Sequence, residues 1–256
     1  MRDTWSPEQY HQFTRERRQP YEDLVALVEP RAGMRVVDLG CGTGELTRDL
    51  ADRLEAASAL GLDRSEAMLE RARAHASERV AFRRVEIERH VFDAPLDLVF
   101  SNAALHWVDG HVQVLARARE ALAPGGQLAV QVPDNFAQPT HTTAVALAQE
   151  PLFAAALGGE LAGARVEQPE TYARLLYHLG FREQRVRQQV YLHVMPGPES
   201  AIEWVKGSVL TWYRARLGEA LYAEFEARYR ERLLAQLGDE RPFPLTYRRT
   251  LLWARL

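Results

Sequence analysis

Three glycines and two acids in the first quarter of the chain have the types and spacing of a cofactor site. Gly40, Gly42 and Gly44 form a G-x-G-x-G turn directly after an apolar run that contains Asp38. Such glycines let the backbone approach a ligand, although a dinucleotide site more often reads G-x-G-x-x-G. A second apolar run ends in Asp63, where an acid can accept both hydroxyls of a ribose. The paired motifs predict a nucleotide-like cofactor; the alternative is a turn that only joins a strand to a helix.

A parallel sheet is needed to bring these motifs together. From residue 35 onward, short apolar runs alternate with amphipathic stretches, which is typical of repeated βα units. The carboxyl ends of parallel strands form the ligand crevice of an open α/β sheet, so the glycine turn and Asp63 meet at that edge, with a helix starting near Glu45. The predicted strands are 35–39, 58–62, 80–85, 96–101 and 127–132.

The sequence around these units predicts one domain over residues 1–256. Two helices are expected within 1–30, the first capped by Ser6 and interrupted by Pro20, the second ending before Pro30. Prolines and glycines after Val132 indicate loops. The later predictions are a helix near 168–179, a strand at 181–194, a helical cap insertion of two helices at about 196–241, and a final antiparallel strand at 246–256.

The composition excludes some partners. The chain has 256 residues, 46% hydrophobic composition and a net charge of -3, so electrostatics favour neither nucleic acid nor an anionic membrane. No stretch approaches the ~20 apolar residues of a membrane span, and the N-terminus has no signal-like apolar region, so we expect a cytoplasmic protein. The single cysteine, Cys41, suits a tight turn better than a role as nucleophile. No metal site is predicted.

Taken together, the motifs resemble those of class I methyltransferases that use S-adenosylmethionine. Leu122-Ala123-Pro124-Gly125-Gly126 matches the family's L-x-P-G-G turn, and Val85-Glu86-Ile87 resembles its acidic-apolar pair, with Glu in place of Asp. The resemblance implies a Rossmann-like seven-stranded α/β sheet, mostly parallel with an antiparallel last strand, plus a helical cap. The cofactor-binding residues that it implies are Arg17, Asp38, Gly40, Cys41, Gly42, Asp63, Arg64, Met68, Glu86, Ile87, Asn102, Ala103 and Trp107.

Two of these positions have alternative interpretations. In the family, the acid of the third strand receives the adenine amino group; the alternative for Glu86 is a solvated surface residue. The segment from Val99 to Trp107 passes beneath the methionine half of the cofactor in the family. There, Trp107 could offer its aromatic face to the sulfonium cation, or could belong to the core.

Further segments resemble the trans-aconitate 2-methyltransferase family. They are Trp5-Ser6-Pro7, Ser101-Asn102-Ala103-Ala104-Leu105-His106-Trp107, Gln131-Val132-Pro133-Asp134-Asn135 and Pro139-Thr140-His141. The resemblance implies methyl esterification of one carboxylate of a small tricarboxylic acid. The sequence departs from the family at two positions, where the family commonly has Gln in place of His106 and Arg in place of Gln19.

Esterification of a carboxylate makes modest chemical demands. The acceptor has a pKa near ~4 and is ionised at neutral pH, so no general base is required and His106 is an orienting donor at most. Rate acceleration would come mainly from alignment. The other carboxylates need donors, because an unpaired anion in a closed pocket is costly. The predicted substrate-binding residues are Tyr10, Trp107, Asn135, His141, Trp204, Tyr213 and Arg248, with Arg17 and Arg214 as further basic candidates.

Two alternatives remain open on sequence, and a third fits the motifs poorly. The enzyme could methylate another small acid or a hydroxyl metabolite, since residues 160–241 carry no specific motif. The protein could bind S-adenosylmethionine without catalysis, as a sensor or partner subunit. A nicotinamide dehydrogenase fits the G-x-G-x-G turn and the Pro124-Gly125-Gly126 turn poorly.

Overall fold

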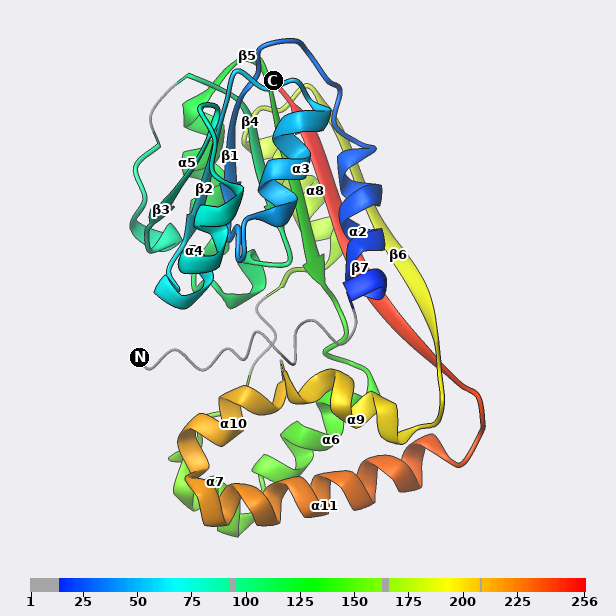
Figure 1. Ribbon diagram of the computed structural model, residues 1–256. Helices are drawn as coiled ribbons and strands as arrows, with labels where there is room; N and C mark the ends of the chain where they lie inside the picture. Colours follow the sequence, from blue (N-terminus) through cyan, green and yellow to red (C-terminus); the bar gives the residue numbers. More distant parts are fainter. Residues whose placement is uncertain (1–13, 93–94, 163–165, 208) are drawn as a thin grey trace. The chain divides into compact units, whose positions relative to one another are not determined.

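The computed structural model describes residues 14–92, 95–162, 166–207 and 209–256, with side chains described from residue 18 onward. Seven strands form one sheet in the order β3-β2-β1-β4-β5-β7-β6 (Figure 1). Strands β1 to β5 pair in parallel, and β7 runs antiparallel to β5. The strands are β1 (Arg35–Leu39), β2 (Ser58–Asp63), β3 (Val80–Arg84), β4 (Leu96–Asn102), β5 (Leu122–Pro133), β6 (Glu183–Met195) and β7 (Phe243–Arg255). The predicted fold class is confirmed.

The chain divides into two compact units. The sheet unit comprises Arg17–Pro133, Arg165–Gln189 and Arg249–Leu256, and the helical unit comprises Met1–Glu16, Asp134–Ala164 and Val190–Arg248. No helix among the described residues is both long enough and apolar enough to cross a membrane.

The sheet unit buries two separate apolar faces, because successive strand residues point to opposite sides. Val36, Phe100 and Ala129 belong to the face covered by α2 (Thr14–Val25) and α3 (Glu45–Arg53). Their chain neighbours Val37, Val99 and Val130 belong to the opposite face, which packs against α5 and α8 (Figure 1). The other helices of this unit are α4 (Glu66–Ala72), η1 (Arg73–His75), η2 (Ile87–Arg89), η3 (Leu105–Trp107), α5 (His111–Ala121) and α8 (Pro169–His178).

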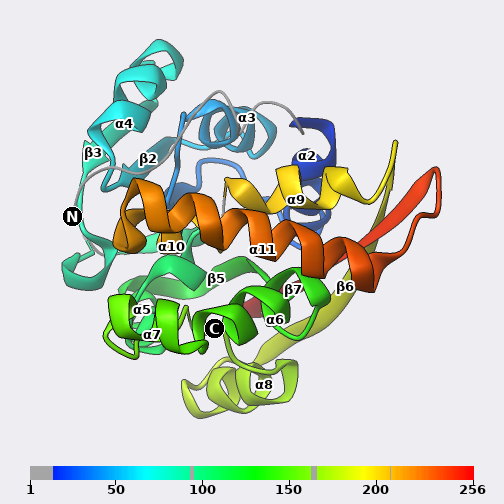
Figure 2. The ribbon, with the colours of Figure 1, turned by 90° about the horizontal axis from the view of Figure 1, so that it is seen from below.

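The helical unit has its own core of aromatic and aliphatic side chains. Phe153, Tyr213, Phe225 and Tyr229 are fully buried in it. Helix α11 packs along α6 and also contacts α9 and α10 (Figures 1 and 2). Its helices are α6 (Pro139–Ala148), α7 (Pro151–Leu157), α9 (Glu199–Lys206), α10 (Val209–Leu217) and α11 (Glu219–Leu237).

Prolines account for two errors of the sequence prediction. Pro139 and Pro151 do not mark loops but begin α6 and α7. Proline is tolerated there, because the N–H groups of the first helical turn make no hydrogen bond within the helix. Pro20 was expected to interrupt a helix but lies inside α2, and that helix ends at Val25 rather than just before Pro30.

Two further boundaries differ from prediction. The described residues of the cap insertion form three helices instead of two, because α9 ends before Gly207 and Val209 begins a new helix. Strand β5 begins at Leu122, five residues before the predicted start, and includes a separate turn at Gly125 (φ 72°). The pairing of β5 with β4 has a register irregularity nearby, between Leu96 and Leu98 of β4.

Candidate cofactor and acceptor site

The glycine turn after β1 has the backbone that only glycine adopts easily. Gly40, Gly42 and Gly44 have φ values of 78°, 55° and 77°. A Cβ on Gly40 would lie 2.1 Å from the Cβ of Ala104, and one on Gly44 would lie 2.6 Å from Phe82. A Cβ on Gly42, by contrast, would have no atom of the described residues within 4 Å. The turn is therefore closely packed at its two ends and open at its centre, which fits a ligand that approaches the Gly42 backbone.

Asp63 holds this turn. Its Oδ2 accepts a hydrogen bond from Gly42 N (3.0 Å), and its Oδ1 accepts one from Ser65 N (2.9 Å). The side chain is half-buried, and each carboxylate oxygen can accept more than one hydrogen bond. Asp63 therefore lies beside the open centre of the turn with acceptor capacity left for a ribose.

Asp38 is a buried acid behind the turn. Its Oδ2 accepts the hydroxyl of Thr47, in the first turn of α3, at 2.5 Å. Burial raises the pKa of Asp38 to about 7; the Thr47 hydrogen bond opposes this shift, and the charge of Asp63 adds to it. The motif predicts Asp38 as a site residue but not Thr47, because a position nine residues later carries no motif signal.

Cys41 packs inside the turn. It is 8% exposed, and Leu62 O accepts hydrogen bonds from the backbone N–H groups of both Gly40 and Cys41. Burial raises the pKa of the Cys41 thiol, so the thiolate needed for nucleophilic attack is disfavoured.

The exit from β4 lies against the turn. Ser101 Oγ donates to Leu39 O at 2.9 Å, and Ala104 packs against Gly40. Ala103 has a φ of 55°, which is uncommon for a residue with a side chain and indicates a constrained exit. The Oδ1 of Asn102 is buried and has no hydrogen-bond partner within the described chain. The residues that the resemblance assigned to the cofactor on β1 and β4 thus meet at one edge of the sheet.

Residues His106 and Trp107 lie in η3, immediately after this exit. Their rings are 4.7 Å apart, and both residues are half-buried. Trp107 is thus neither a core residue nor a fully exposed one.

The other predicted cofactor residues differ in exposure. Glu86 is exposed and pairs with Arg89 at 3.7 Å, which matches the alternative of a solvated acid. Ile87 is buried in the sheet core, and Met68 is buried on α4. Arg64 is exposed. The side chain of Arg17 lies outside the described part of the chain.

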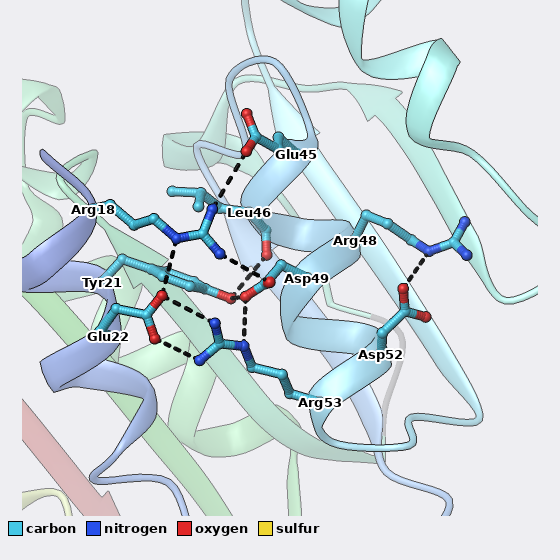
Figure 3. Close-up of polar contacts among 9 residues, drawn as sticks. All are labelled: Arg18, Tyr21, Glu22, Glu45, Leu46, Arg48, Asp49, Asp52 and Arg53. Carbon is cyan, nitrogen blue, oxygen red and sulfur yellow. Dashed lines mark hydrogen bonds and ion pairs between the residues drawn. The ribbon is translucent and has the colours of Figure 1, made fainter. Parts of the chain in front are cut away.

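A polar network fixes α2 to α3, the helix that follows the glycine turn (Figure 3). Asp49 accepts hydrogen bonds from the Tyr21 hydroxyl (2.7 Å) and Arg18 (3.0 Å) and pairs with Arg53 (2.7 Å). Glu22 pairs with the same two arginines. Burial raises the pKa of Tyr21, which keeps its hydroxyl a donor. No motif in the sequence indicates this network.

The acceptor candidates of the helical unit fall into two groups. Trp204 and Tyr213 are core residues: Trp204 packs against Tyr247 (5.4 Å) and Tyr213 stacks on Phe225 (4.7 Å). Asn135 is 1% exposed, and its amide group exchanges two hydrogen bonds with the backbone of Arg248, at 3.0 and 2.8 Å. Asn135 therefore positions Arg248, and Tyr10 lies outside the described residues.

Two basic side chains of this unit differ in charge. Burial lowers the pKa of His141 to about 4, so its imidazole is neutral near pH 7 and is not a cationic donor. Arg248 is half-buried, and its Nε has no hydrogen-bond partner within the described residues. Arg248 is therefore the better donor for an anion. No group of three or more His, Cys, Asp or Glu side chains in the described ranges could hold a metal ion.

Comparison with known proteins agrees with this geometry. A family model described as a methyltransferase domain matches residues 30–186. The trans-aconitate 2-methyltransferase of Deinococcus radiodurans is 43% identical over 94% of both chains, and that of Methylobacterium nodulans is 39% identical over 96% of this chain and 98% of its own. The chain belongs to the trans-aconitate 2-methyltransferase family.

Solved structures support the fold independently. A methyltransferase from Thiobacillus denitrificans, solved in complex with S-adenosyl-L-homocysteine, superposes with a TM-score of 0.54 at 22% identity. The alignment covers 100% of this chain and 93% of that one. At this identity the likeness concerns the fold alone.

Proposed function

We propose that the protein transfers a methyl group from S-adenosylmethionine to a carboxylate of trans-aconitate, giving the monomethyl ester. The observation that carries the proposal is identity of 43% and 39%, over 94% and 96% of this chain, to curated trans-aconitate 2-methyltransferases, combined with a glycine turn that is open at Gly42 beside Asp63. The partner is a small molecule.

The residues around the turn fit the proposed cofactor. Gly42 offers open space for close approach, and Asp63 offers oxygens to ribose hydroxyls. Trp107 and the buried Oδ1 of Asn102 suit the cationic methionine end, because aromatic faces and uncharged oxygens stabilise a sulfonium or ammonium. When bound, the cofactor supplies an electrophilic methyl group.

The transfer requires alignment rather than proton movement. With the cofactor bound, a carboxylate oxygen would form the new C–O bond as the S–CH3 bond broke, and the bonding electrons would pass to sulfur. No proton is released, so His106 needs no role as a base. Arg248, held by Asn135, is the proposed donor to an acceptor carboxylate.

An acceptor panel with a labelled methyl group tests the proposal. The enzyme and labelled S-adenosylmethionine would be mixed in turn with trans-aconitate, citrate, isocitrate and simple phenols. We expect trans-aconitate to have the highest kcat/KM. A higher kcat/KM for a phenol or another acid would show that trans-aconitate is not the preferred substrate. Tight cofactor binding without methyl transfer to any acceptor would indicate a non-catalytic binding protein.

A further inference from the structure

Two buried glutamines on β5 differ in how their amides are used. Gln127 and Gln131 are four residues apart and so lie on the same face of the strand. The Oε1 of Gln127 accepts from Glu29 N (2.9 Å) and Trp253 Nε1 (2.8 Å), and its Nε2 donates to Glu29 O (2.7 Å). Gln131 is 0% exposed, yet neither its Oε1 nor its Nε2 has a partner in the described chain. Gln127 thus has a structural role that Gln131 lacks.

Gln131 lies in a row of polar residues at the carboxyl ends of the parallel strands. Asn102 is its register partner on β4 and also has an unpartnered buried oxygen. On β7, Arg249 is 8% exposed and lies opposite Pro133, diagonal to Gln131 and within reach of it for a long side chain. Asp38 occupies the same face of β1. We call Asp38, Asn102, Gln131 and Arg249 the terminal row; all four belong to the sheet unit.

The face of the terminal row follows from the core packing. Val36, Phe100, Ala129 and Leu251 belong to the apolar face covered by α2 and α3. Each lies two residues from a member of the terminal row on the same strand, and residues two apart point to the same side of a sheet. The row therefore continues this face beyond its apolar part, toward the edge at which the glycine turn begins.

The charges along the row have a direction. Asp38, a carboxyl group, stands at the glycine-turn end, two amides follow, and the guanidinium of Arg249 stands at the far end. A buried amide without partners destabilises a fold, so its presence calls for a ligand that satisfies it. A cation suits the Asp38 end, and an anion suits the end formed by Gln131 and Arg249.

We propose that Gln131 is an acceptor-binding residue, whose Nε2 donates to a carboxylate of the methyl acceptor beside the positive charge of Arg249. This inference rests on the proposed function and adds a specificity determinant to it. Because Gln131 exposes no surface, the side chains over it must shift for the acceptor to reach it. An acid brings a negative charge to the end of the row that carries Arg249, whereas an acceptor with only a hydroxyl brings none, so the row favours acids.

The matched pair Gln131→Met and Gln127→Met tests the proposal, with Met as an apolar side chain of similar length. The readouts are the KM for trans-aconitate, the Kd for S-adenosylhomocysteine by calorimetry and the Tm of the ligand-free protein. We expect Gln131→Met to raise KM at least about tenfold, to leave the Kd unchanged and not to lower Tm. Gln127→Met should lower Tm, because Trp253 Nε1 and the backbone of Glu29 lose their partners, and should leave KM unchanged.

Other results overturn the inference. If Gln131→Met lowers Tm and leaves KM unchanged, the amide has a structural role in the core. If the substitution weakens binding of S-adenosylhomocysteine and leaves KM unchanged, the amide binds the cofactor. If Gln131→Met does not fold, Gln131→Glu provides the test. Its carboxylate should repel the acceptor and raise KM further, and an unchanged KM would contradict the proposal.

A binding measurement separates this inference from the proposed function. Trans-aconitate is titrated into the complex of the enzyme with S-adenosylhomocysteine, which reports affinity without turnover. If the wild-type complex binds trans-aconitate but the enzyme does not methylate it, the proposed function is wrong. The affinity of the Gln131→Met complex for trans-aconitate would still show whether the amide binds the acid. No binding of trans-aconitate to the wild-type complex would overturn both.

Discussion

Asp63 combines two tasks in one side chain. It accepts hydrogen bonds from Gly42 N and Ser65 N, so it shapes the turn, and it is the residue proposed to bind the ribose. A carboxylate that is already oriented by two backbone donors loses little conformational freedom when a ligand arrives. Its contribution to affinity should therefore be large.

We expect Asp63→Ala to weaken S-adenosylhomocysteine binding by about 10- to 100-fold, measured by calorimetry. The matched control is Asp97→Ala. Asp97 likewise accepts a backbone N–H, that of Arg35 at 2.9 Å, but it belongs to the amino-terminal part of β4, away from the glycine turn. Equal affinity of Asp63→Ala and wild type would remove Asp63 from the ribose site.

His106 is the residue on which the acceptor chemistry can be judged. A carboxylate acceptor is ionised at neutral pH, so loss of the imidazole should not remove a required base. We expect His106→Gln to keep turnover within about tenfold of wild type. If turnover falls more than about a thousandfold while the affinity for S-adenosylhomocysteine is unchanged, His106 transfers a proton, and the acceptor is a hydroxyl.

At the scale of elements, the glycine turn separates packing from binding. A methyl group on Gly40 meets Ala104, whereas one on Gly42 points into open space. We expect Gly40→Ala to lower the Tm more than Gly42→Ala does. For the same loss of Tm, Gly42→Ala should lose more cofactor affinity than Gly40→Ala. Both substitutions introduce the strain of a positive φ, so the difference between them reports the effect of the atoms that surround each added methyl group. Identical behaviour would argue against a ligand at Gly42.

The α2–α3 network makes a second prediction about elements. Asp49→Asn weakens two ion pairs and the hydrogen bond from Tyr21, so we expect it to lower the free energy of unfolding by about 1–3 kcal/mol in urea titrations. Asp52→Asn affects only exposed pairs with Arg48 and Arg79 and should change it by less than about 0.5 kcal/mol. Equal effects would mean that the network adds nothing to the packing of α2.

The elements also show how far sequence patterns reach. Strands β1 to β4 and the glycine turn could be predicted, because a buried parallel strand is an apolar run and a positive φ selects glycine. Pro139 and Pro151 misled the prediction, because the same residue serves a loop and the first turn of a helix. The partners of Asn135 and Gln127 lie 113 and 98 residues away or more, so no local pattern could assign their amides.

At the scale of the whole molecule, burial of Asp38 predicts how stability depends on pH. Its folded pKa of about 7 lies above the unfolded value of about 3.9, so the folded state holds a proton that the unfolded state has lost. Its contribution to stability is therefore present below about pH 4 and is lost as the pH rises toward about 7, at up to about 1.4 kcal/mol per pH unit.

Asp38→Asn should remove that slope. Urea unfolding of wild type and variant across this pH range should show the variant gaining stability relative to wild type as the pH rises. Parallel profiles would mean that Asp38 is ionised in the folded protein throughout.

The central claim concerns the reaction of the intact chain, and product analysis by mass spectrometry tests it most directly. Purified enzyme is incubated with trans-aconitate and S-adenosylmethionine that carries a deuterated methyl group. We predict one deuterated methyl group on one carboxylate oxygen of trans-aconitate, with stoichiometric release of S-adenosylhomocysteine. Unmodified trans-aconitate after complete incubation, with the cofactor bound but intact, would contradict the account.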